Sequence, residues 1–361
     1  MQGSHARWIR LGVSVTTPSP GHITNFKNLE VAWTFKTEHL GKNPDFNLQA
    51  TPVMVKGVLY FTAGAHRDAV AVNAATGEML WMYRLDEGAR KSPRVLSGRG
   101  VGYWTDGRGD ERIFFVTVGY QLIALDAKTG RPIQSFGRNG IIDLREDDDQ
   151  VMDLMTADVG WNGAPVVARN VVLIGASHSA SGRTKANVKG YVRGFDARTG
   201  NRLWTFHTIP RPGEFGNDTW LDDSWSYTGN TGVWTQITVD EELGIAYLPC
   251  APLLADVTVN GRTIKVVAQP TKQGFLFVFD RQTGQPVWPI EERAVEKGTV
   301  PTEWRLPARR GDRFHACDQG GSAEGAVAIH DRSALHAADH TRIRRQDREA
   351  ALARSRWLAT A

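Results

Sequence analysis

Apolar and polar residues alternate in a unit that occurs four times along the chain. Each copy has an alternating apolar run, then Asp or Asn, then Thr-Gly, and then an apolar residue or Trp. The copies are residues 69–81 (AVAVNAATGEMLW), 121–133 (QLIALDAKTGRPI), 191–204 (YVRGFDARTGNRLW) and 276–288 (LFVFDRQTGQPVW). Alternation predicts a strand with one buried face, and Asp near Thr-Gly predicts a tight turn whose Gly has a positive φ. A strand–turn–strand unit repeated along one chain predicts a repeat architecture.

Further strand pairs precede the copies. They are predicted at residues 51–62, around Lys56-Gly57, and at 164–177, 234–249 and 251–267. Elsewhere a copy of the repeat follows each such pair, but the last two pairs are separated by Cys250 alone. The sequence therefore predicts that one copy of the repeat is missing at this junction.

Composition narrows the class of protein. The 12 Trp and 37 Gly suit a turn-rich β protein, and the net charge of +4 comes from residues 305–361, so no nucleic-acid surface is predicted. Cys250 and Cys317 form neither a disulfide framework nor a metal motif. No apolar run is long enough to span a bilayer. The first 15 residues lack the apolar core and cleavage site of a signal peptide.

Three segments depart from the alternating pattern. Residues 141–160 contain four consecutive acidic residues, Glu146 to Asp149, for which a solvated loop is favoured over a cation site. Residues 207–227 form a long aromatic loop of the kind that is often functional. Beyond Trp304 the alternation stops. The expected organisation is an irregular segment at 1–24, a repeat array at 25–304 and a disordered tail at 305–361.

The Asp-x-x-Thr-Gly-x-x-x-Trp repeat resembles that of the quinoprotein dehydrogenases, which bind pyrroloquinoline quinone (PQQ), and most closely the glucose-dehydrogenase-like branch. The likeness is strongest in residues 189–220, 224–234 and 268–298. It implies an all-β fold, an eight-bladed β-propeller that is incomplete in this chain. It also implies PQQ with calcium or a similar divalent ion, a periplasmic location, and electron transfer from a sugar or alcohol to a membrane quinone or cytochrome.

The resemblance implies roles for five residues. Trp234 would stack on the quinone, Lys272 in TKQG would lie beside its oxygens, and Arg67 would reach a PQQ carboxylate. Ser177 would contact the cofactor from a loop, where His178 is the candidate for polarising the substrate or cofactor. The alternatives are a core Trp, a surface Lys, a surface Arg and a solvated loop His.

The same resemblance predicts what this chain lacks. The family's His-His-x-x-Trp-Asp segment, which carries the catalytic Asp, belongs between Pro249 and Cys250 and is absent. The metal-ligand position that follows Tyr247-Leu248-Pro249 is absent too, so no metal ligand is assigned. The sequence after Arg305 also departs from the family, which implies that the remaining blades are missing.

Three hypotheses follow. The leading one is a truncated, internally deleted PQQ-dependent sugar or alcohol dehydrogenase, whose parent activity is base-assisted hydride transfer to the quinone and is impaired in this chain. The second is a non-catalytic propeller scaffold or binding module, which would not need Trp234 or Lys272. The third is a gene remnant without function.

Overall fold

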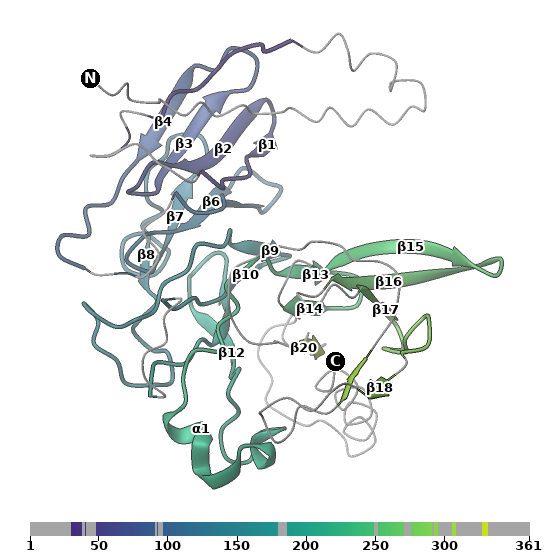
Figure 1. Ribbon diagram of the computed structural model, residues 1–361. Helices are drawn as coiled ribbons and strands as arrows, with labels where there is room; N and C mark the ends of the chain where they lie inside the picture. Colours follow the sequence, from purple (N-terminus) through teal and green to yellow (C-terminus); the bar gives the residue numbers. More distant parts are fainter. Residues whose placement is uncertain are drawn as a thin grey trace, which may run out of the picture. The chain divides into compact units, whose positions relative to one another are not determined.

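The computed structural model describes residues 30–37, 40, 48–90, 92, 97–179, 186–248, 252–270 and 276–290, and the backbone of three short strands beyond residue 291. These residues form antiparallel sheets in two compact units (Figure 1). The first unit comprises residues 1–165 and 197–200, and the second the rest. In the described part of the chain, no helix has the length and apolar character needed to cross a membrane. The prediction of an all-β fold is confirmed.

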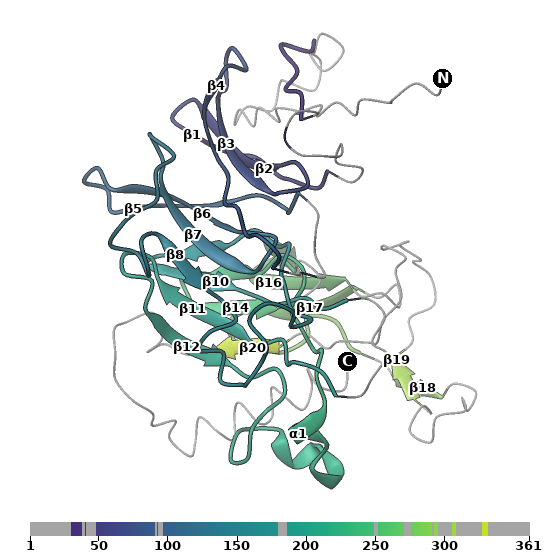
Figure 2. The ribbon, with the colours of Figure 1, turned by 90° about the vertical axis from the view of Figure 1, so that its left-hand side faces the viewer.

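The first unit contains two four-stranded sheets whose strands follow one another in chain order (Figure 2). The first sheet has β1 (Val53–Val55), β2 (Val58–Ala63), β3 (Asp68–Asn73) and β4 (Met79–Tyr83). The second has β5 (Gly102–Thr105), β6 (Glu111–Val116), β7 (Gln121–Asp126) and β8 (Ile141–Asp143). The two sheets share a core in which Tyr60 and Ala71 of the first pack with Ile113, Phe115 and Leu125 of the second. The inner strands β2, β3, β6 and β7 are buried along most of their length, which accounts for their apolar sequences.

The turn between β3 and β4 has the geometry that the repeated sequence predicts. Asn73 Oδ1 accepts hydrogen bonds from the N–H groups of Ala75 and Thr76 at 2.8 and 3.2 Å. Gly77 has a φ of +74°, and its N–H donates to the Asn73 carbonyl at 2.8 Å. The same bonds recur at two other turns, closed by Asp126 with Gly130 and by Asp280 with Gly284. The predicted turn chemistry is confirmed there.

An indole packs on the turn of the following sheet. Trp81 Nε1 donates to the Ala127 carbonyl at 3.0 Å, and a Cβ at Gly130 would lie 2.6 Å from the Trp81 ring. Only glycine fits at position 130, because the backbone has a positive φ and because the Trp81 ring occupies the space that a Cβ would need. The same relation holds between Trp33 and the turn that contains Ala74 and Gly77.

In the third copy of the repeat, the turn from Asp196 to Gly200 accepts hydrogen bonds from a different type of side chain. Gln134 stands where the first copy of the repeat has Trp81, four residues after the turn's Gly, and its Nε2 donates to the Pro132 carbonyl at 3.2 Å. Instead, Arg112 Nη1 donates to the Ala197 carbonyl at 3.0 Å and to the Arg198 carbonyl at 2.6 Å. In the first three copies of the repeat, the carbonyl of the residue after the turn's Asp or Asn thus accepts a side-chain donor, from Trp33, Trp81 and Arg112 in turn.

The acidic run at residues 146–149 is less solvated than predicted. Asp148 is only 3% exposed, and Gln150 Nε2 donates to Asp148 Oδ2 at 2.8 Å. Arg145 is also buried, which lowers its pKa from the usual value. Its guanidinium donates to the carbonyls of Leu154, Ala157 and Val159. The prediction of a solvated loop is wrong at Asp148, because the segment folds back around Arg145.

The second unit begins with one more four-stranded sheet, of order β12-β11-β10-β9. Its strands are β9 (Val166–Ala168), β10 (Val171–Ile174), β11 (Val192–Asp196) and β12 (Arg202–Phe206). The next hairpin is β13 (Thr238–Asp240) with β14 (Ile245–Leu248). It is followed by the sheet of β15 (Leu253–Val259), β16 (Arg262–Pro270) and β17 (Leu276–Asp280). The hairpins predicted from the alternating pattern are confirmed.

The sheet that contains β14 and the sheet of β15, β16 and β17 share a core. Ile245 and Tyr247 of β14 pack with Val267, Phe277 and Phe279 of the neighbouring sheet. A buried ion pair, Arg281 Nη1 to Asp240 Oδ2 at 2.6 Å, joins them at one end. These contacts hold the β13–β14 hairpin against the sheet of β15, β16 and β17, although its own sheet has only three strands.

Three short strands are formed by residues beyond 291. β18 (Glu292–Ala294) pairs with β19 (Arg305–Pro307), and β20 (Val327–His330) pairs with β14. Two of these strands fall within the tail predicted to be disordered. The segment predicted to be irregular, residues 1–24, lies outside the described residues, and the boundary at residue 304 stays a prediction.

Candidate functional site

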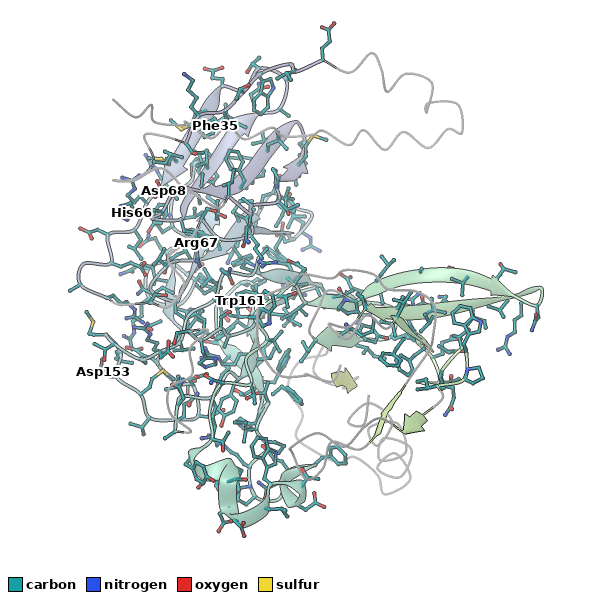
Figure 3. All side chains as sticks on the ribbon, in the orientation of Figure 1. Phe35, His66, Arg67, Asp68, Asp153 and Trp161 are labelled. Atoms are coloured by element: carbon teal, nitrogen blue, oxygen red, sulfur yellow. The ribbon has the colours of Figure 1, made fainter. Side chains whose placement is uncertain are left out.

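Arg67 lies in the turn between β2 and β3, with a φ of +58°, and its N–H donates to the Gly64 carbonyl at 3.0 Å. The residue is 2% exposed, so the alternative of a surface Arg is wrong. Its Nη1 donates to the carbonyls of Val116 and Thr117 at 3.1 and 3.2 Å, and also to that of Trp161 (Figure 3). Carbonyl dipoles therefore surround this buried cation, and its role towards a cofactor carboxylate stays a prediction.

The residues on either side of Arg67 differ in environment. His66 is exposed, whereas Asp68 is completely buried (Figure 3). Arg84 Nε donates to Asp68 Oδ1 at 2.8 Å, and this hydrogen bond raises the pKa of Arg84. Asp68 is thus matched by the charge of Arg84.

Ser177 and His178 follow β10 in the second unit. Ser177 is 1% exposed and His178 is 6% exposed, so the alternative of a solvated loop His is wrong. Within the part of the chain that the structure describes, Ser177 Oγ is buried and has no hydrogen-bond partner. A buried hydroxyl without a partner costs about 1–3 kcal/mol. Such an atom marks a place where a polar ligand would stabilise the protein.

Glycines bring a second segment close to these two residues. A Cβ at Gly232 would lie 2.4 Å from the Ala176 carbonyl oxygen and 3.1 Å from His178 Cε1. A Cβ at Gly190 would lie 2.3 Å from Gly232 Cα. The backbones of three segments can therefore meet only because these positions have no side chain. Sequence reasoning missed Gly190 and Gly232, although the Thr-Gly-Asn-Thr-Gly run at 228–232 contained the signal.

Hydrogen bonds tie the same segments together. Asn187 Nδ2 donates to Asn230 Oδ1 at 2.9 Å, and the hydroxyls of Thr208 and Thr231 are 3.0 Å apart. Lys189 Nζ donates to the Ser226 carbonyl at 3.1 Å, and burial, followed by the nearby charge of Arg211, lowers the pKa of Lys189. These bonds fix the backbone that leads into Trp234.

Trp234 is half-buried, and Val233 and Thr235 on either side of it are buried. Trp234 is thus less buried than the residues on either side of it. Trp33 and Trp81, which pack on repeat turns, are half-buried too, so both the role at the quinone and the alternative of an ordinary repeat Trp in the core stay predictions. Ser177, His178 and Trp234 lie in the second unit and Arg67 in the first, while Lys272 lies outside the described residues.

The long loop predicted at 207–227 has internal order. His207 Nδ1 lies 2.7 Å from Glu214 Oε1, and the ring packs edge-on against Tyr191 with centroids 4.5 Å apart. The loop also contains η2 (Asn217–Thr219), η3 (Leu221–Asp223) and α1 (Ser224–Tyr227). Its functional role stays a prediction.

The second-unit residues fit a flat, polar group. Ser177 offers an unused hydroxyl, Trp234 offers an indole face, and the glycines allow close approach of the backbone. A planar ring system gains stacking energy on a fixed indole, and its polar rim would satisfy the serine. Among the described residues no three His, Cys, Asp or Glu side chains are grouped so as to hold a metal ion.

Comparison with known families gives one match that covers most of the chain. The β-propeller domain of PQQ-dependent glucose, ethanol and alcohol dehydrogenases matches residues 22–251 and again 248–352. The two matched segments overlap at residues 248–251, which is the junction where the sequence predicts a missing copy of the repeat.

Individual relatives are more distant and much longer. The quinoprotein glucose dehydrogenase of Escherichia coli is 25% identical over 79% of this chain and 43% of its own length. The large subunit of the glycerol dehydrogenase of Gluconobacter oxydans is 25% identical over 79% of this chain and 46% of its own. The chain thus spans less than half the length of these curated relatives.

A solved structure gives the same result. The quinohemoprotein alcohol dehydrogenase ADH-IIG of Pseudomonas putida is 25% identical, with a TM-score of 0.55, over 72% of this chain and 43% of that one. The sheets described above therefore correspond to blades of a PQQ-type propeller, as the sequence predicted.

Proposed function

The chain belongs to the β-propeller family of PQQ-dependent glucose, ethanol and alcohol dehydrogenases, and from this premise we propose that it binds PQQ but oxidises a sugar or alcohol poorly. The observation that carries the proposal is the buried hydroxyl of Ser177, which has no hydrogen-bond partner in the described chain. It lies in the same unit as the half-buried Trp234.

Three residues of the second unit would hold the cofactor. Trp234 would stack on the ring system, and Ser177 would donate to one of its oxygens. Lys272 would place a cation beside the quinone oxygens. The family resemblance gives Arg67, in the first unit, a role towards a PQQ carboxylate, and this role stays a prediction. His178 is buried beside Ser177 and is the candidate for polarising the substrate. When bound, PQQ supplies the two-electron acceptor for the substrate's carbon–hydrogen bond.

The poor turnover follows from the junction after Leu248. In the family resemblance, the segment with the general base belongs between Pro249 and Cys250, where this chain has no residues. Two observations support an internal loss: the family match divides at residues 248–251, and β14, the second strand of its sheet, is followed directly by β15, the first strand of another. Without a positioned base, proton removal from the substrate hydroxyl loses a contribution of about 10²–10⁴-fold.

The wider setting is part of the same proposal. The substrate is a sugar or alcohol, as the names of the relatives suggest. Calcium or a similar divalent ion would accompany PQQ, the location would be the periplasm, and a membrane quinone or cytochrome would accept the electrons. The loss of the metal-ligand position after Pro249 predicts that the ion is held more weakly than in relatives that keep this position.

Binding can be tested directly by titrating the purified chain with PQQ, in the presence of calcium, and following tryptophan fluorescence. Ser177→Ala should weaken binding about 3–10-fold, the value of one hydrogen bond. Ser226→Ala is the matched control, because Ser226 is exposed and its backbone carbonyl, not its hydroxyl, accepts the hydrogen bond from Lys189. Absence of saturable quenching, or equal affinity of wild type and Ser177→Ala, would overturn the proposed cofactor site.

A further inference from the structure

The second strand of each complete sheet is paired on both sides by its neighbours in the chain. β2 lies between β1 and β3, β6 between β5 and β7, and β10 between β9 and β11. β14 occupies the same position, because it follows β13 through a tight turn in which Gly244 N–H donates to the Asp240 carbonyl at 2.8 Å. A third strand, adjacent in sequence, is therefore expected on its other side.

The chain does not supply that strand locally. The next strand, β15, begins a separate sheet, in which it pairs with β16 in register from Leu253 with Ala268 to Val259 with Arg262. β17 then completes that sheet. The junction that removes a copy of the repeat thus also removes the natural partner of β14.

An unpaired β14 would be costly. Its four residues, Ile245, Ala246, Tyr247 and Leu248, are between 1% and 8% exposed. Buried backbone N–H and C=O groups without partners carry a large free-energy penalty. A regular apolar edge strand also recruits other strands and leads to aggregation.

In the structure a strand from far along the chain occupies this edge. β20 pairs antiparallel with β14, in register from Ile245 with His330 to Leu248 with Val327. The sequence of β20, Val-Ala-Ile-His, has the β-branched residues that favour strands. The chain from Asp280 to Val327, at about 3.3 Å per extended residue, is long enough to reach β14 from the neighbouring sheet.

We propose that the open side of β14 is a strand-acceptor site and that residues 327–330 of the same chain are its occupant, replacing the strand lost at the junction. The main chain of β20 supplies the affinity, as in strand addition to an exposed sheet edge. Because the donor is tethered, its effective concentration at the edge exceeds that of any free strand. The C-terminal segment then has a structural role in this chain.

Two proline variants, Ala328→Pro and Ile329→Pro, form a matched pair. Along an edge strand the N–H groups point alternately towards and away from the partner strand, so only one of these prolines removes a bond to β14. Amide hydrogen exchange of residues 245–248 is the readout, and β2 is the internal reference. We expect one variant to speed exchange in β14 at least tenfold and the other to have a much smaller effect, with β2 unchanged in both.

Three outcomes would overturn the proposal. If neither proline changes exchange in β14, residues 327–330 do not occupy the edge. If wild type is a dimer whose β14 protection is lost on dilution, the occupant is the strand of a second copy, as in domain swapping. A synthetic peptide of residues 322–335 supplies a further test, because it should restore slow exchange to the disrupted variant, and failure to do so would contradict strand addition.

Discussion

The sheets β5–β8 and β13–β14–β20 begin in the same way and end differently. Both open with a tight hairpin, and in each the second strand is almost fully buried. In β5–β8 the third strand follows within a few residues and ends in the Asp-x-x-Thr-Gly turn. In the other sheet the third strand is β20, far along the chain.

The difference between these two sheets shows that hairpin formation and sheet completion depend on different interactions. Turn chemistry is local, so hairpins form wherever the sequence has the right residues, on either side of the junction. Completion of a blade is non-local, because it depends on which strand arrives next. In the first unit the contact between Trp81 and Gly130 is a further non-local interaction. In the second unit the non-local interaction is the pairing of β20 with β14.

The largest expected effect concerns the docked turn. Gly130→Ala forces a left-handed alanine and places its Cβ 2.6 Å from the Trp81 ring, so we expect a loss of about 2–4 kcal/mol in the free energy of unfolding. Gly107→Ala is the control, since Gly107 has a φ of +72° and a Cβ added there would have no atom within 4 Å. It should cost about 1 kcal/mol. Equal losses in urea unfolding would show that the indole contact contributes nothing.

The next largest effect compares Arg112 and Trp81 as side-chain donors to the carbonyls of a turn. Arg112→Met leaves the carbonyls of Ala197 and Arg198 without this donor and Asp110 without its cation, so we expect a loss of about 2–3 kcal/mol. Trp81→Phe removes only one hydrogen bond, and the Ala127 carbonyl still accepts from Tyr60 at 3.2 Å. Its expected cost is about 1 kcal/mol. The prediction fails if thermal or urea unfolding ranks the two variants in the opposite order.

The smallest expected change in stability comes from removing the hydroxyl of Tyr103 in β5 or of Tyr247 in β14. Tyr103 Oη donates to Glu111 Oε2 at 2.9 Å, while Tyr247 Oη has no partner among the described residues. Tyr103→Phe should therefore cost about 1 kcal/mol, and Tyr247→Phe close to zero. A substantial loss in Tyr247→Phe at pH 8 would mean that its hydroxyl is bonded.

The same pair predicts a dependence on pH. Burial is the main cause that raises the pKa of both Tyr103 and Tyr247 to about 12. The folded state then holds the phenolic proton more tightly than the unfolded state, whose pKa is about 10. Stability is unaffected below about pH 10 and falls as the pH rises towards 12. Each Phe variant should make this alkaline fall shallower in unfolding curves measured between pH 9 and 12.

Much of this could be predicted from the sequence because it is local. The turns at Gly77 and Gly130 and the hairpin at Lys56-Gly57 follow from residue type alone. The junction at Cys250 was visible because a regular order of hairpins and repeats is interrupted there. Trp234 and Ser177 could be proposed from the family resemblance, and their burial is compatible with the roles it implies.

The rest required contacts between distant residues. Nothing in the sequence around Arg67 shows that carbonyls from Val116, Thr117 and Trp161 surround it. The replacement of a docking Trp by Arg112 could not be foreseen, because Arg112 lies in β6, far along the chain from Gln134, which corresponds to Trp81. The pairing of β20 with β14 is likewise invisible to periodicity, which reports that a strand exists and not what it pairs with.

The most direct test of the account is the steady-state rate at which the purified chain reduces an artificial electron acceptor. The assay would contain PQQ, calcium and either glucose or a primary alcohol, at a PQQ concentration that saturates the fluorescence titration. The account predicts saturable binding with a protein-dependent rate about 10²–10⁴-fold below that of a relative that has the catalytic Asp segment. A substantial, protein-dependent rate that Ser177→Ala reduces would contradict it and show that the chain is a working dehydrogenase.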